Sequence, residues 1–293
     1  MSEKLQKVLA RAGLGSRREI ERWIADGRIQ INNRVAQLGD RITGQEYIQL
    51  DAKPLALNES QAQTIRVIAY HKSIGSVCSR QDQQGRPTVF DDFPKLKNGR
   101  WILVGRLDLN TTGLLLATTD GELANRLMHP KYQVKREYAV RIYGDVNDAM
   151  LHRLQRGVEL DDGIARFDNI TLQGGEGRNH WFTVDIHEGR NREVRRLWES
   201  QGVQVNRLAR NSFGPIQIPR RLRRGEYQEL TQGQVDHLCR LVQLLPSSEA
   251  TNKESRKKLS TSAKPKRKIR ELPVASSRKK TLKRKKGAST RTR

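Results

Sequence analysis

Hydrophobic positions near the start of the chain recur with the spacing of two short helices. From Leu5 to Ala12 they fall three and four residues apart, which places them on one helix face, and Gly13 can end that helix. Ser16 and Glu19 then form the S-x-x-E pattern of a capping box ahead of a second apolar stripe. The segment RIQINNRV follows, and its alternating apolar positions before an Asn-Asn turn predict a strand.

A second region shows the two-residue alternation of strands, interrupted by helical patterns. The polar run from Glu59 to Thr64 has the composition of a linker ahead of it. The segments TIRVIAYHKS, REYAVRIYG and HWFTVDIHEG are enriched in strand-forming residues. Asp120 can cap a helix over GELANRLM, and NREVRRLWES has a helical pattern that ends near Gly202. We therefore predict an α+β fold, with a small αα-β unit over residues 1–62 and a mixed-sheet domain over residues 63–246.

The charge of the chain points to a polyanionic partner. There are 56 Lys and Arg residues against 32 Asp and Glu residues, a net charge of +24. Such an excess favours nucleic acid ahead of an anionic membrane. Residues 247–293 hold 18 of the basic residues, three acidic residues and few large apolar ones. Because this segment cannot bury enough apolar surface to offset chain entropy, we expect a disordered basic tail with general RNA affinity, or else one that is only solvated.

Several classes of protein are excluded by the sequence. No apolar run approaches the roughly 18 residues of a membrane-spanning helix, so no membrane partner is expected. The segment MSEKLQKVLARAG lacks the apolar core and cleavage site of a secretory signal, and the expected location is cytoplasmic. Cys78 and Cys239 lack CxxC spacing and the six histidines are scattered, which argues against disulfides and a zinc site. Phosphate-loop and dinucleotide signatures are also missing, so no cofactor is expected.

Basic residues gather on both predicted N-terminal helices. They are Lys4, Lys7 and Arg11 on the polar side of the first helix and Arg17, Arg18 and Arg22 at the start of the second. One basic helix face is usually only solvated, but two adjoining faces favour RNA binding. Over about sixty residues, the order SRR, helix, DGRI, hairpin and GD resembles the alpha-L RNA-binding motif, which many RNA-modifying enzymes carry. That resemblance implies RNA binding, and by itself no chemistry.

One carboxylate stands at an unusual place in this basic chain. Asp108 lies in GRLDLNTTGLLLATTDG, between two hydrophobic runs and ahead of a Thr/Gly turn. An Asp at such a place is most often a turn residue. However, the flanking runs predict buried strands that anchor its loop, and a carboxylate held there is costly unless a cation lies nearby. Spacing alone leaves a turn residue and a reactive group open.

Three motifs together resemble the pseudouridine synthases, in the branch that modifies ribosomal RNA and carries an alpha-L motif in front. They are GRLDLNTTGLLLATTDG, REYAV and EGRNREVRRL, and the resemblance extends from about Glu3 to Leu245. It implies a mostly antiparallel sheet with flanking helices, and a role for each matching residue. Asp108 is the nucleophile, Tyr138 packs on the target base, Arg195 pairs with the catalytic carboxylate, Val194 touches the base, and Arg106 enters the space left by an extruded nucleotide.

The same resemblance implies conversion of one uridine in large-subunit (23S) ribosomal RNA, or a large-subunit precursor, to pseudouridine by a monomer. The base is flipped out of its helix. Asp108 attacks the anomeric carbon or assists loss of the sugar's carbon-2 proton, and Arg195 keeps it ionised. Tyr138 stacks on the uracil and either does only that or also removes the carbon-5 proton. The main rival function is a non-enzymatic RNA-binding or ribosome-assembly protein, ahead of a DNA-binding regulator.

Removal of residues 250–293 tests the role expected for the tail. The truncation deletes many cations but no proposed site residue. RNA binding should therefore weaken and become less dependent on salt, while the choice of uridine persists. Equilibrium binding at several salt concentrations and mapping of pseudouridines measure these two effects. Modification of a different uridine would contradict the prediction, because the tail would then take part in recognition.

Overall fold

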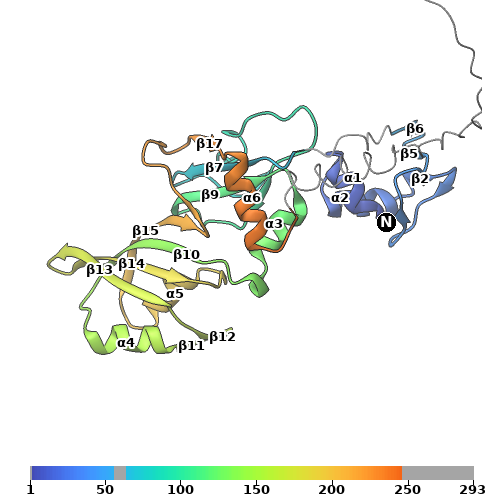
Figure 1. Cartoon of the computed structure of the whole chain (residues 1–293). Helices are drawn as coiled ribbons and strands as arrows, with labels where there is room; N and C mark the ends of the chain where they lie inside the picture. The colour runs from blue at the N-terminus through green and yellow to red at the C-terminus, as the bar shows by residue number, and fades with distance from the viewer. Residues whose placement is uncertain (1, 56–63, 246–293) are drawn as a thin grey trace, which may run out of the picture. The chain divides into compact units, whose positions relative to one another are not determined.

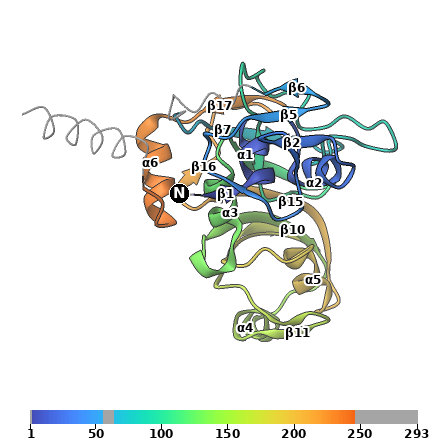
Figure 2. The same cartoon turned by 90° about the vertical axis from the view of Figure 1, so that its right-hand side faces the viewer.

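The computed structural model describes residues 2–55 and 64–245. Its first part contains a short strand, β1 (Glu3–Lys4), and two helices, α1 (Leu5–Arg11) and α2 (Arg17–Ala25). The strands β3 (Arg34–Val35), β2 (Ile29–Ile31), β5 (Ile48–Leu50) and β6 (Lys53–Pro54) form an antiparallel sheet in this order, and β4 (Arg41–Ile42) pairs with β1. Figure 2 shows α1, α2, β2 and β5 close together.

The N-terminal helices form where the sequence predicts them. The Ser16 hydroxyl accepts a hydrogen bond from the Glu19 backbone (3.1 Å), and the Glu19 carboxylate accepts one from the Ser16 backbone (3.2 Å). Both halves of the capping box are therefore made. Asn32 and Asn33 have φ angles of 48° and 66°, as a tight hairpin turn requires. The apolar residues of both helices and of the small sheet form a common core.

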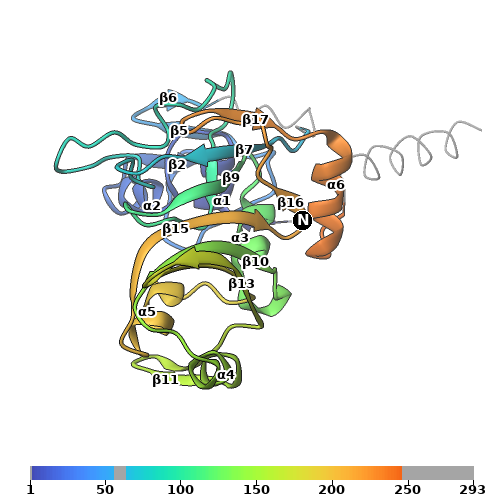
Figure 3. The ribbon, with the colours of Figure 1, turned by 90° about the vertical axis from the view of Figure 1, so that its left-hand side faces the viewer.

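The second part is built on one large mixed sheet. Its strands follow one another in the order β13 (Asn169–Glu176), β14 (Asn179–Ile186), β10 (Arg136–Tyr143), β15 (Gln204–Phe213), β9 (Thr112–Thr118), β7 (Val67–Lys72) and β17 (Tyr227–Glu229) (Figure 3). The short strands β8 (Ile102–Val104) and β16 (Ile216–Gln217) pair with β9 and β15. A separate hairpin consists of β11 (Val158–Leu160) and β12 (Gly163–Ala165).

Strands β7 and β9 are buried on both faces, so alternate residues enter two different cores. Val67 and Leu114 belong to the core covered by α3 (Gly121–Met128) and α6 (Gln232–Leu241), whereas Ile68 and Leu115 belong to the other (Figure 1). Asp120 caps α3 by accepting a hydrogen bond from the Leu123 backbone (2.6 Å), as the sequence predicts. Strands β7 and β9 are therefore held between two cores, and the loop that carries Asp108 leads into β9.

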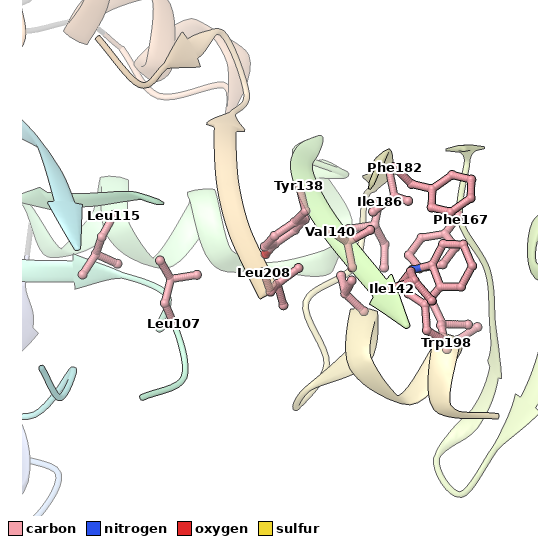
Figure 4. Close-up of a cluster of buried hydrophobic side chains, with 14 of the residues drawn as sticks. Leu107, Leu115, Tyr138, Val140, Ile142, Phe167, Phe182, Ile186, Trp198 and Leu208 are labelled. Carbon is pink, nitrogen blue, oxygen red and sulfur yellow. The ribbon is translucent and has the colours of Figure 1, made fainter. Parts of the chain in front are cut away.

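The other core includes residues of α4 (Asp148–Arg156) and α5 (Glu193–Glu199). Trp198 of α5 is fully buried, and its ring lies 5.8 Å from that of Phe167 and 5.1 Å from that of Phe182. Figure 4 shows this group, with Tyr138 at one side of it, next to Leu208. Because α5 is anchored by Trp198, the residues in its first turn have fixed positions relative to β10 and β15.

The two halves of the sheet meet where β9 and β15 run parallel. Thr112 lies opposite Ala209, and Gly113 lies opposite Arg210. A side chain at Gly113 would collide with the backbone of Arg210, and its φ of 102° is one that other residues rarely adopt. We call this contact the parallel seam. The loop that precedes β9 carries Asp108, and the parallel seam places this loop next to β15.

The predicted fold class is confirmed. A small N-terminal unit is followed by a mixed sheet with helices, and the strand pairs other than the parallel seam are antiparallel within the large sheet. The predicted tail of residues 247–293 lies outside the described residues, as does most of the predicted linker.

Substitution of Gly113 by Ala tests the parallel seam. The added methyl group meets the Arg210 backbone in a conformation that is already unfavourable, so the free energy of unfolding should fall by more than about 2 kcal/mol. Gly121→Ala is the matched control, because that position at the start of α3 has an ordinary φ and only a 3.4 Å contact to Ile102. Urea unfolding measures both variants. Equal stabilities would contradict the proposed close approach.

Candidate active site

A cavity of about 1000 Å³ lies along the parallel seam. Its exposed lining residues, which we call the rim, include Gln81, Gln84, Arg106 and Arg192. Its buried lining residues from β10 and β15, which we call the floor, are Arg136, Tyr138, Leu208, Arg210 and Phe213. Asp108 and Val194 also line the cavity. The fold therefore brings four of the predicted site residues, from three distant motifs, to one hollow.

Asp108 lies in the loop between β8 and β9 and is half-buried. The Thr111 backbone donates a hydrogen bond to the Asp108 carbonyl (3.0 Å), which closes a turn. The carboxylate has no ion pair within 4 Å among the described residues, but the charges of Lys72 and Arg195 act on it. The sequence predicts a cation near Asp108. The structure has two, Lys72 and Arg195, and neither forms an ion pair with the carboxylate.

Lys72 is a residue that sequence reasoning missed. It ends β7, is fully buried, and donates hydrogen bonds through Nζ to the carbonyls of Ser73 (3.0 Å), Leu109 (3.4 Å) and Thr111 (3.1 Å). Burial lowers the pKa of Lys72, whereas the charge of Asp108 acts in the opposite direction. A lone lysine at the end of an apolar strand gives no local signal of this role. Only the pairing of β7 with β9 brings it under the Asp108 loop.

Arg195 lies behind the cavity wall and is nearly fully buried. Its guanidinium donates to the carbonyls of Asn110 (3.0 Å) and Val205 (3.0 Å), whereas the family resemblance implies a direct pair with Asp108. Burial lowers the pKa of Arg195, Arg192 adds to this effect, and Asp108 opposes it. Lys72 and Arg195 together therefore bind three successive carbonyls, those of residues 109, 110 and 111.

Tyr138 and Val194 present apolar surface to the cavity. Tyr138 is 9% exposed and stands on β10 opposite Val184 and Arg210, and Val194 is 6% exposed in the first turn of α5. Leu208 of the floor lies beside Tyr138 (Figure 4). An aromatic ring between aliphatic side chains can hold a planar base by stacking.

Arg106 stands at the rim, is exposed, and forms no ion pair with any residue in the described part of the chain. A second rim segment carries Arg86, which is tied to Asp82 by hydrogen bonds of 2.7 and 3.0 Å. The mouth of the cavity therefore offers cations and amide groups to a polar, negatively charged ligand.

Sequence reasoning did not predict Arg136 and Arg210 of the floor as site residues. Arg136 donates to the carbonyls of His187 (3.4 Å) and Glu188, and its guanidinium lies directly against Gly189. Arg210 donates through Nε to the Leu114 carbonyl (2.8 Å). Its Nη2 is buried and has no hydrogen-bond partner among residues 2–55 and 64–245. An unsatisfied buried donor costs about 1–3 kcal/mol, and Nε of Arg195 is in the same state.

The six N-terminal cations that the sequence predicts to bind RNA divide into two groups. Lys7 and Arg11 both pair with Glu3, at 2.8 and 2.6 Å, and the hydrogen bond from Lys7 is the largest influence that lowers the pKa of Glu3. Lys4 lies in β1, at the position before α1, so the prediction that it belongs to the first helix is wrong. The other four of the predicted RNA-binding cations have no ion pair to a described residue, and these are Lys4, Arg17, Arg18 and Arg22.

The described residues contain no group of three or more His, Cys, Asp or Glu side chains placed to hold a metal ion. Among the same residues, no helix has the length and apolar character needed to cross a membrane.

Comparison with known proteins places these features in a family. Residues 66–200 match the model of the RNA pseudouridylate synthases, and residues 3–46 match the S4 domain. A protein of Escherichia coli O6:H1 named ribosomal large subunit pseudouridine synthase B is 57% identical over 252 residues, which cover 85% of this chain and 87% of that protein. A protein of the same name from Pseudomonas aeruginosa is 54% identical over 247 residues, 84% of this chain and 64% of that protein.

A solved structure described as a pseudouridylate synthase is 26% identical to this chain. It superposes with a TM-score of 0.56 over 80% of this chain and 99% of its own. The predicted resemblance is thus confirmed by sequence and by fold, and the chain belongs to the RNA pseudouridylate synthase family, whose members are isomerases.

Proposed function

We propose that this protein converts a specific uridine of large-subunit (23S) ribosomal RNA, or its precursor, to pseudouridine. The observation that carries the proposal is that Asp108 and Tyr138 line one cavity, while the charges of the buried Lys72 and Arg195 act on Asp108. The ribosomal substrate is inferred from the relatives that are named for the large subunit. The reaction is an isomerisation without redox change, so it draws on acid–base and nucleophilic groups of the chain alone.

In this proposal Asp108 carries the central chemical step. Its carboxylate either forms a bond to the sugar's anomeric carbon or takes the carbon-2 proton, and in both cases the uracil departs. Lys72 and Arg195 hold the loop carbonyls that follow Asp108, so they act as positioning residues. A loop fixed in this way keeps the carboxylate ready for the bound sugar and loses little entropy when the substrate enters.

The target base is flipped into the cavity, because the atoms that react are inaccessible within a stacked helix. Tyr138 stacks on the uracil, and Val194 packs against it from α5. Arg106 at the rim enters the space that the extruded nucleotide leaves in the RNA. The cost of unstacking, about a few kcal/mol, is offset by contacts between basic side chains and phosphates.

Binding and chemistry are divided between parts of the chain. Residues 1–62 hold the RNA through the exposed cations Lys4, Arg17, Arg18 and Arg22, together with Lys7 and Arg11, which are also paired with Glu3. Residues 63–246 carry out the reaction, and the tail of residues 247–293 adds general affinity. We propose that the protein acts as a monomer.

Asp108→Asn tests the enzymatic assignment against a purely RNA-binding role. The substitution removes the nucleophile but leaves size and basic surface unchanged, so pseudouridine formation should cease while RNA affinity changes less than about twofold. Mapping of pseudouridines in ribosomal RNA, together with a binding titration, measures both effects. Turnover by the purified variant would refute the role of Asp108. Absence of any ribosomal pseudouridine that depends on the wild-type protein would refute the substrate.

Substitutions of Tyr138 separate stacking from proton removal. Phe keeps the aromatic face, worth about 1–3 kcal/mol of stacking, and loses the hydroxyl, whereas Ala loses both. We expect Tyr138→Phe to break the glycosidic bond but to stall before carbon-5 loses its proton, and Tyr138→Ala to be severely impaired. Release of tritium from carbon-5-labelled RNA in a single turnover measures this step. Full release by both variants would show that Tyr138 is only a core residue.

A further inference from the structure

Two arginines of the floor pack on one aromatic ring. The guanidinium carbons of Arg136 and Arg210 lie 5.2 and 5.1 Å from the centroid of Phe213. Arg136 stands opposite Phe213 in the β10–β15 pair, and Arg210 stands opposite Tyr138. Arg136 is 8% exposed and Arg210 is 2% exposed. The floor therefore holds two fixed positive charges directly beside the tyrosine.

These two charges have no carboxylate bound to them. Within residues 2–55 and 64–245, neither Arg136 nor Arg210 forms an ion pair, and both donate hydrogen bonds to backbone carbonyls. Glu193 acts on Arg136 only through its longer-range field. Buried charges without a counter-ion are unfavourable. The floor is thus suited to receive negative charge from a ligand, and Arg210 lines the cavity with only Nε of its guanidinium hydrogen-bonded to a described residue.

The depth of this floor indicates which part of the RNA supplies that charge. A flipped nucleotide enters base first, while its phosphates remain on the strand at the rim, where Arg106 and Arg192 are exposed. The group that reaches Tyr138 and Arg210 is therefore the uracil. A neutral uracil becomes an anion when its bond to the sugar breaks.

We propose that Arg210, with Arg136 beside it, stabilises the uracil anion formed during the reaction, an inference that rests on the proposed function. When the C1′–N1 bond breaks, its electron pair stays on the uracil and is shared with O2 and O4. A bond from Asp108 to C1′, or transfer of the C2′ proton to Asp108, balances this departure. The guanidinium of Arg210 donates to a uracil carbonyl oxygen and stabilises the charge there on either path.

The remaining steps restore neutrality without a further reactant. The rotated uracil forms a bond from C5 to C1′, and Asp108 leaves C1′ or returns the proton to C2′. C5 then loses its proton and N1 gains one, so the product is an isomer of the substrate. Arg210 acts on the uracil between the two bond changes and is needed whichever role Asp108 takes.

A comparison of two leaving groups tests this proposal. RNA that carries uridine or 5-fluorouridine at the target site is mixed with excess enzyme, and loss of the target nucleoside is followed in a single turnover. Fluorine withdraws electrons and stabilises the departing anion by itself, so it replaces part of the effect of Arg210. Arg210→Gln should slow the reaction of uridine about 10- to 100-fold and that of 5-fluorouridine by a much smaller factor.

Two further variants complete the experiment. Arg207→Gln changes the same charge on an exposed position of the same strand outside the cavity, and it should leave the ratio of the two rates unchanged. Arg210→Lys keeps the charge but loses the planar fork. Arg210→Lys should also lower the rate for uridine by a larger factor than the rate for 5-fluorouridine. It provides the same test if Arg210→Gln does not fold.

Equal losses on both substrates would overturn the proposal, because they indicate that Arg210 only supports the fold or binds a phosphate. Pseudouridine formation by the wild-type protein is scored on the same unmodified RNA. If the wild-type protein forms no pseudouridine, the proposed function is wrong. If it does, but Arg210→Gln leaves the ratio of the two rates unchanged, only the role of Arg210 is wrong.

Discussion

The position of Asp108 depends on two buried cations that bind three successive carbonyl groups. Lys72 donates to the carbonyls of residues 109 and 111, and Arg195 donates to the carbonyl of residue 110. Carbonyl groups of a loop need donors of this kind where no strand pairing satisfies them. Both cations also act on Asp108 through their charge. The same two side chains therefore set the shape and the electrostatic environment of the loop.

That arrangement is possible only because the two halves of the sheet join at a very short parallel contact. Two register pairs, which include Gly113 opposite Arg210, connect β9 to β15. The Asp108 loop belongs to one half, whereas Tyr138 belongs to the other. Gly113 allows the backbones to approach where any side chain would collide. The site is consequently a property of the seam, and neither half of the sheet contains it alone.

Positive charge is used in two distinct ways in this molecule. At the surface, Arg17, Arg18 and Arg22 are exposed, which suits contacts with phosphates that weaken as salt concentration rises. In the interior, the cations are fixed by backbone carbonyls and shielded from water, so their fields are strong and little affected by salt. The net charge of +24 counts exposed and buried cations together, so it does not distinguish these two roles.

Local sequence patterns by themselves determined the elements whose signals lie within a few residues. The capping box at Ser16, the cap at Asp120 and the alternation along β7 all specify their elements because a helix cap or strand face is a short-range property. The motifs also identified the family and predicted the site residues Asp108, Tyr138 and Val194, which line one cavity. Only the tertiary structure placed Lys72, Arg136 and Arg210 at the site, and turned Arg195 toward a carbonyl instead of the carboxylate. Those positions depend on strand pairing and on the packing of α5 across long sequence separations, which no local pattern encodes.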